Sequence, residues 1–186
     1  MKIRFKQKQV GWCCPLTLAN LFQDDTLLQH VGDEKFKGCT TDEVKFLLKE
    51  HFDKNYSIST VAQSNVDYPP LTNQFVWDVL SKDLRDEFKH ISDRMPIVPY
   101  FLSVKLHEKS KFWHFVSVVF CNGKLLYIDP YKENVIEVNS LTDLYVNFYS
   151  VSLIERLAME TEEGLKWACM FGDIYGYEEY FKKETA

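Results

Sequence analysis

The chain has 186 residues, of which 46% are hydrophobic and 26% charged, and this balance predicts one folded domain over residues 1–186. The formal net charge of −5 gives no electrostatic reason to expect binding to nucleic acid or to an anionic membrane. The basic first residues lead into no apolar segment. We therefore expect no signal peptide and no membrane insertion, and a cytoplasmic protein, with secretion as an effector left open.

The five cysteines have the spacing of neither a disulfide framework nor a structural zinc site. Their number is odd, and the sequence contains no Cys-x-x-Cys and no Cys-x-x-His. Cys13 and Cys14 are adjacent, and a disulfide between neighbouring residues is geometrically strained. We expect reduced thiols, no metal site and no cofactor.

The first half of the chain is predicted to be mainly helical. One helix begins around Pro15, whose missing N–H costs nothing in a first turn, and runs to about Phe22 with a buried apolar face. A second helix is expected over residues 40–50, where Thr40 and Glu43 form a capping box. The remaining elements expected in this half are a strand at 56–61 and a helix at 73–84 with Phe75, Val76, Val79 and Leu80 facing inward.

The second half changes to β-structure. Apolar strands are expected at 96–104 and 113–121, and Asn122-Gly123 is typical of a hairpin turn. The other expected elements are strands at 124–128, 135–138 and 148–153 and a terminal helix from Glu162. Helices first and antiparallel strands second predict an α+β domain.

The start of the first helix is a candidate site for nucleophilic chemistry. Cys13 lies where the helix dipole favours a negative charge. A thiolate there is a strong nucleophile when a neighbouring imidazolium lowers its pKa. Such a nucleophile needs a base and a group that orients the base.

The hairpin of the second half supplies candidates for both. Of the five histidines, only His114 begins an apolar strand, where packing can fix its ring. Asp129 ends the returning strand of the same hairpin. Because a tight turn brings the start of one strand beside the end of the other, we expect His114 and Asp129 to be neighbours at one end of the sheet.

Taken together, these motifs resemble the papain-like cysteine peptidase superfamily, and within it the bacteriocin-processing, double-glycine-leader peptidases. In that family a glutamine precedes a Cys-Gly-Pro sequence, and a later strand led by histidine is followed by a strand that ends in Asp-Pro. The matching residues here are Gln7, Cys13-Cys14-Pro15, His114–Phe120 and Asp129-Pro130. The resemblance spans roughly residues 5 to 131.

The resemblance implies a papain-like fold, in which an N-terminal helical half with the cysteine helix packs on a C-terminal antiparallel sheet with the histidine and aspartate. It implies that Cys13 is the nucleophile, His114 the general base and then acid, and Asp129 the group that orients the imidazole. Gln7 would donate to the oxyanion hole beside the Cys13 backbone N–H. The implied activity is that of a thiol protease, which cleaves a peptide or protein substrate through an acyl-enzyme.

Several alternatives stay open at this point. Cys14 stands where the family has glycine, and we expect it to narrow the cleft or alter substrate choice. Cys14 is also an alternative nucleophile and Gln9 an alternative oxyanion donor, although the Gln7 spacing favours Cys13. The same residue types fit a glutamine deamidase or transglutaminase-like acyl transferase that acts on a protein. A non-catalytic binding module on the same fold is the remaining alternative.

Overall fold

The structure, a computed structural model, describes residues 2–8, 11–31, 41–52, 58–63, 74–75, 78, 80, 97–105, 111–121, 124–138 and 150–157. Its helices are α1 (Cys13–Phe22), the 3-10 helix η1 (Asp25–His30) and α2 (Thr41–Phe52). Its strands are β1 (Ile58–Gln63), β2 (Ile97–Lys105), β3 (His114–Cys121), β4 (Lys124–Ile128), β5 (Ile136–Val138) and β6 (Ser150–Leu157).

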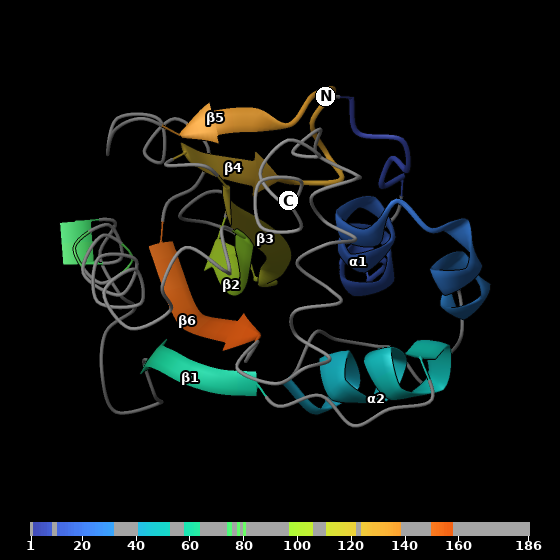
Figure 1. Cartoon of the computed structure of the whole chain (residues 1–186), viewed down its shortest axis with the longest axis horizontal. Helices are drawn as coiled ribbons and strands as arrows, with labels where there is room; N and C mark the ends of the chain where they lie inside the picture. The colour runs from blue at the N-terminus through green and yellow to red at the C-terminus, as the bar shows by residue number, and fades with distance from the viewer. Residues whose placement is uncertain are drawn as a thin grey trace, which may run out of the picture.

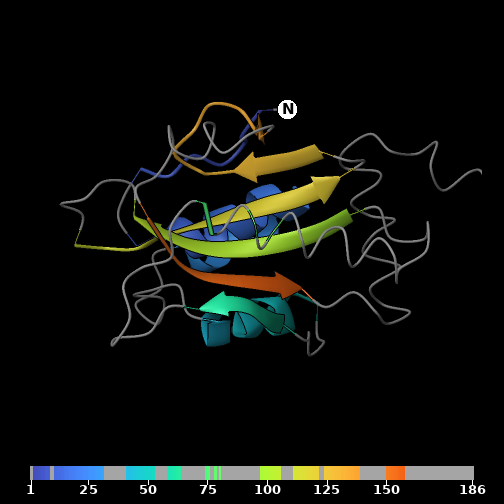
Figure 2. The ribbon, with the colours of Figure 1, turned by 90° about the vertical axis from the view of Figure 1, so that its left-hand side faces the viewer.

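These strands form one antiparallel sheet in the order β1-β6-β2-β3-β4-β5 (Figure 1). The helices α1 and α2 lie on the same side of the sheet (Figure 2). Of the two, α1 packs on β3 and β4, the strands of the predicted hairpin. The chain therefore has the mixed helix and antiparallel sheet that its sequence predicts.

The core lies between α1 and the sheet. All ten residues of α1 are buried, so the helix is enclosed on every side. Its apolar side chains join Leu47 and Leu48 of α2 and the stacked rings of Phe101 and Phe115, whose centroids are 5.5 Å apart. Two polar side chains of α1 are buried with them, and buried polar groups need hydrogen-bond partners.

Most predicted elements are present with boundaries shifted by a few residues. The second helix begins at Thr41, the first strand begins two residues later than expected, and the last described strand extends to Leu157. The sequence did not predict η1, where Asp24 accepts a hydrogen bond from the Thr26 N–H. Thr40, the Asn122-Gly123 turn and the terminal helix from Glu162 lie outside the described residues.

The third predicted helix is described only at Gln74, Phe75, Asp78 and Leu80, which are helical. Leu80 is buried, as its spacing predicts. The inward orientation predicted for Phe75 is wrong, because its side chain is 47% exposed. Helical spacing of apolar residues predicts which side of a helix faces the core, but it does not tell whether a residue at the margin of that side is buried. Phe75 lies at such a margin and is exposed. In the part of the chain that the structure describes, no helix has the length and apolar character needed to cross a membrane.

Candidate active site

Cys13 is the first residue of α1 and carries a thiol, as Cys14 does. The preceding residue, Trp12, makes no side-chain capping hydrogen bond to the helix. Cys13 thus lies in the first turn of the helix, where the positive end of the helix dipole acts on it. Gly11 leads into this turn with a φ of 94°, which glycine adopts without strain.

His114 and Asp129 are brought together by the pairing of β3 with β4. Ser117 pairs with Ile128, so the same register continued by one pair places Asp129 opposite Val116. His114 is two residues from Val116, and diagonal neighbours across a strand pair are within side-chain reach. The His114 Nε2 and an Asp129 carboxylate oxygen, Oδ1, are 2.8 Å apart, and both side chains are buried. His114 and Asp129 are therefore neighbours, as the hairpin predicts.

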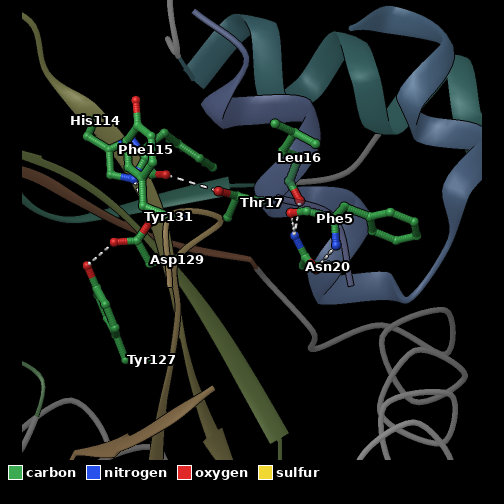
Figure 3. Close-up of polar contacts among 9 residues, drawn as sticks. All are labelled: Phe5, Leu16, Thr17, Asn20, His114, Phe115, Tyr127, Asp129 and Tyr131. Atoms are coloured by element: carbon green, nitrogen blue, oxygen red, sulfur yellow. Dashed lines mark hydrogen bonds and ion pairs between the residues drawn. The ribbon is translucent and has the colours of Figure 1, made fainter. Parts of the chain in front are cut away.

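The Asp129 carboxylate accepts three hydrogen bonds (Figure 3). Oδ1 accepts from His114 and from the Tyr131 backbone N–H at 2.9 Å, and Oδ2 accepts from the Tyr127 hydroxyl at 3.1 Å. Burial alone raises the pKa of Asp129, but the hydrogen bond and charge of His114, together with the two other donors, hold it below its usual value. Burial and the charge of Asp129 raise the pKa of Tyr127, so its hydroxyl stays a donor. Asp129 is thus an ionised carboxylate fixed in orientation.

His114 interacts with Cys13 as well as with Asp129, and the interaction with the Cys13 side chain contributes to its raised pKa. Since Nε2 faces Asp129, Nδ1 is the ring nitrogen that remains for a second partner. Burial alone lowers the pKa of His114. The hydrogen bonds to Asp129 and Cys13 and the charges of both groups outweigh burial and raise this pKa to about 9. His114 is therefore an imidazolium at neutral pH, and its charge favours the thiolate form of Cys13.

The ring of Tyr131 covers one face of the His114 imidazole. The two ring centroids are 4.7 Å apart and tilted by 37° (Figure 3). Tyr131 is 44% exposed, so it forms part of the molecular surface beside the buried histidine. Burial raises the pKa of Tyr131, and so do the charges of Cys13 and Asp129.

The raised pKa of His114 predicts the pH dependence of any reaction that needs its proton. As pH rises through about 9, the imidazolium loses that proton, so general acid catalysis is expected to decline there. Replacement of Cys13 with alanine is expected to lower the His114 pKa, because the Cys13 hydrogen bond and charge both raise it. NMR titration of His114 in the wild type and in Cys13→Ala measures both values. A wild-type pKa near 6.5, the ordinary value for histidine, contradicts the prediction.

Asn20 fixes the N-terminal segment of residues 2–8 against α1. Its side-chain oxygen accepts from the backbone N–H groups of Arg4 and Phe5, both at 3.0 Å. Its side-chain nitrogen donates to the carbonyls of Phe5 and Leu16, both at 2.8 Å (Figure 3). All four hydrogen bonds of one amide side chain are therefore directed at backbone groups.

The same N-terminal segment is hydrogen-bonded to the turn that follows Asp129. The Gln7 backbone N–H donates to the Pro130 carbonyl at 2.9 Å, and the Ile3 N–H donates to the Glu133 carbonyl at 3.1 Å. The Lys6 ammonium donates to the Lys132 carbonyl at 2.8 Å. The segment thus connects α1, which carries Cys13, with the turn next to Asp129, and it places the buried Gln7 next to that turn.

Removal of the Asn20 amide is expected to destabilise the fold. Asn20→Ala leaves two backbone carbonyls and two backbone N–H groups in a partly buried region without their partner, which predicts a loss of about 3 kcal/mol in the free energy of unfolding. Asn20→Asp is a matched variant, since it keeps the two acceptor contacts but turns a carboxylate oxygen, which cannot donate, toward the Phe5 and Leu16 carbonyls. We expect it to be at least as destabilising as alanine in urea unfolding at neutral pH. A loss below about 1 kcal/mol for Asn20→Ala contradicts this account.

The remaining sequence candidates are placed as follows. Cys14 is fully buried within the core cluster, so its side chain packs in the interior and does not narrow a cleft. His114 interacts with Cys13, which favours Cys13 over Cys14 as the nucleophile. Gln9 lies outside the described residues.

Sequence reasoning missed four residues around the site: Thr17, Asn20, Tyr127 and Tyr131. Thr17 and Asn20 had a usable signal, because they are polar positions within an otherwise apolar helix. Tyr127 lies in β4, two residues before Asp129, which directly follows the strand, and residues at this spacing point to the same side of a sheet. Tyr131 carried no signal in the sequence.

The chain matches no protein-family model, and no curated protein matches it. Within the described residues, no group of three or more histidine, cysteine, aspartate or glutamate side chains is arranged to hold a metal ion.

Proposed function

We propose that this chain is a papain-like cysteine hydrolase that cleaves a peptide or amide bond through an acyl-enzyme. One observation carries the proposal: His114 is hydrogen-bonded to Asp129 and also interacts with Cys13. The nucleophile comes from the start of a helix, and the base and its orienting carboxylate come from two paired strands. The order of these residues along the chain is the order in which the bacteriocin-processing peptidases, which the sequence resembles, carry theirs.

In the first half of the proposed reaction, the Cys13 thiolate attacks the carbonyl carbon of the substrate. The negative charge moves to the carbonyl oxygen, where the Cys13 backbone N–H and the Gln7 side-chain amide are the proposed donors. The imidazolium of His114 then gives its proton to the leaving nitrogen as the carbon–nitrogen bond breaks. The products are a free amine, a thioester on Cys13 and a neutral His114.

In the second half, the neutral His114 takes a proton from water, and the resulting hydroxide attacks the thioester carbonyl. Collapse of this intermediate releases a carboxylic acid and restores the Cys13 thiolate and the His114 imidazolium. Asp129 holds the ring in the orientation that keeps Nδ1 toward the sulfur throughout.

The proposal is tested with an acyl donor that needs no knowledge of the natural substrate. p-Nitrophenyl acetate is expected to release a burst of nitrophenol and to leave one acetyl group on Cys13, located by mass spectrometry of peptides. Absence of acetylation on Cys13 would support the binding module and contradict the hydrolase.

The type of acyl transfer is then read from candidate protein substrates by mass spectrometry. A peptidase produces shorter chains. A glutamine deamidase leaves the chain intact and adds about 1 Da at a glutamine, because the amide becomes an acid through the same acyl-enzyme. We expect chain cleavage, since the residue order resembles that of the processing peptidases.

A further inference from the structure

Thr17 connects the helix of the proposed nucleophile with the strand of the proposed base. It is fully buried in α1, and its hydroxyl donates to the backbone carbonyl of Phe115 at 3.0 Å (Figure 3). Thr17 is four residues after Cys13, and residues at this spacing lie on the same face of a helix. Phe115 directly follows His114 in β3. One buried hydrogen bond therefore joins a point one turn from the sulfur to a point one residue from the imidazole.

Apart from the interaction of Cys13 with His114, the side chains that α1 and β3 contribute to the core cluster, such as Leu18 and Val119, are apolar. Burial of apolar surface is not directional, so it holds a helix on a sheet without fixing its position along the strand. A hydrogen bond has a preferred distance and angle and does fix that position. Groups that react together must be held to within about 0.5 Å of their working geometry. The Thr17 hydrogen bond joins the helix that carries Cys13 to the strand that carries His114, so it can fix the distance between these two residues.

We propose that Thr17 is a positioning residue that sets the register of α1 against β3 and thereby keeps the Cys13 sulfur within hydrogen-bonding reach of His114. The inference rests on the proposed roles of Cys13 and His114. Because the inference concerns only the distance between the Cys13 and His114 side chains, it can be tested without a substrate.

The test compares two substitutions of similar size. Thr17→Val removes the hydroxyl and keeps the volume, whereas Thr17→Ser keeps the hydroxyl. The rate of Cys13 alkylation by iodoacetamide is measured at about pH 6, well below the ordinary thiol pKa of about 8.5. We expect Thr17→Val to lower this rate about fivefold, the equivalent of one net hydrogen bond of about 1 kcal/mol. We also expect a lower His114 pKa in Thr17→Val by NMR titration, because contact with Cys13 raises that pKa. Thr17→Ser should stay close to the wild type in both measurements.

Ser117→Ala is the matched control for general loss of stability. The Ser117 hydroxyl is also buried and donates to a backbone carbonyl, that of Tyr100, at 2.9 Å. This hydrogen bond joins β3 to β2 and does not reach α1. Ser117→Ala should therefore lower the free energy of unfolding and leave Cys13 alkylation and the His114 pKa unchanged.

Three results would overturn the inference. One is an unchanged alkylation rate and His114 pKa in Thr17→Val. Another is an equal change in Ser117→Ala, which would make the effect of Thr17 one of stability alone. The third is an ordinary alkylation rate and His114 pKa in the wild type, which would also remove the proposed function. Should Thr17→Val not fold, Thr17→Ala removes the same hydroxyl without placing a methyl group there, and the same readouts apply.

Discussion

Replacement of Cys13 with alanine is expected to abolish acyl-enzyme formation, while replacement of Cys14 with alanine leaves it largely intact. The two residues are adjacent, but Cys13 interacts with His114, whereas Cys14 packs in the core. Loss of the nucleophile from a triad reduces turnover by about 10⁶-fold in a well-studied protease, so the burst from p-nitrophenyl acetate should fall to background. Removal of the buried Cys14 sulfur should lower the free energy of unfolding and leave the burst amplitude unchanged.

The measurement is the burst amplitude per mole of folded protein, with the acetylated peptide identified by mass spectrometry. Circular dichroism and urea unfolding of each variant establish that the folded fraction is comparable. Acetylation of Cys14, or a full burst in Cys13→Ala, would show that the nucleophile has been assigned to the wrong residue of the pair.

Replacement of Asp129 with asparagine is expected to lower the rate of acyl-enzyme formation by about 10²–10⁴-fold, the range for a positioned acid–base group and its orienting carboxylate. The neutral amide removes both the charge and the charge-assisted hydrogen bond that raise the His114 pKa, so that pKa is expected to fall as well. The amide can also donate to Nε2, which favours the imidazole tautomer with its proton on Nδ1. The thiolate–imidazolium pair then becomes the minor form at neutral pH.

Tyr127→Phe is the matched control for Asp129→Asn. It removes one donor to the carboxylate and leaves the carboxylate in place. We expect a smaller decrease in rate, of about tenfold, which is near the lower end of the roughly 1.5–3 kcal/mol that a hydrogen bond to a charged group contributes, because the carboxylate keeps its charge and its two other donors. The account of Asp129 is wrong if Asp129→Asn and Tyr127→Phe have equal effects, or if the His114 pKa stays near 9 in Asp129→Asn.

The parts of the fold that follow from short stretches of sequence could be predicted. The first helix follows from an apolar run that contains Pro15, and the hairpin follows from two β-rich runs around Asn122-Gly123. The position of β6 between β1 and β2 could not be predicted, because pairing between strands distant in sequence leaves no local signal. The 3-10 helix η1 escaped prediction for a different reason, since it is only six residues long and begins at a local contact in which Asp24 accepts from the Thr26 N–H.

The site residues also divide into those that a short stretch of sequence predicts and those that depend on contacts between distant parts of the chain. His114 and Asp129 are 15 residues apart within one hairpin, so a turn signal suffices to predict that they meet. The pairing of Cys13 with His114 follows from no local pattern and was implied by the resemblance to papain-like peptidases. Thr17 contacts a residue 98 positions away, and only the packing of α1 on β3 creates that contact. For such a residue, sequence reasoning predicts a buried polar group and cannot name its partner.

The most direct test of the central claim is the rate of Cys13 alkylation by iodoacetamide as a function of pH, in the wild type and in His114→Ala. A thiolate–imidazolium pair predicts that wild-type Cys13 reacts well below pH 8.5, the ordinary range for a free thiol, and reacts before Cys14 and the other cysteines. In His114→Ala, the reactivity of Cys13 should move up to that ordinary range. Equal labelling of all the cysteines near pH 8.5 in the wild type, or no change in His114→Ala, would contradict the account.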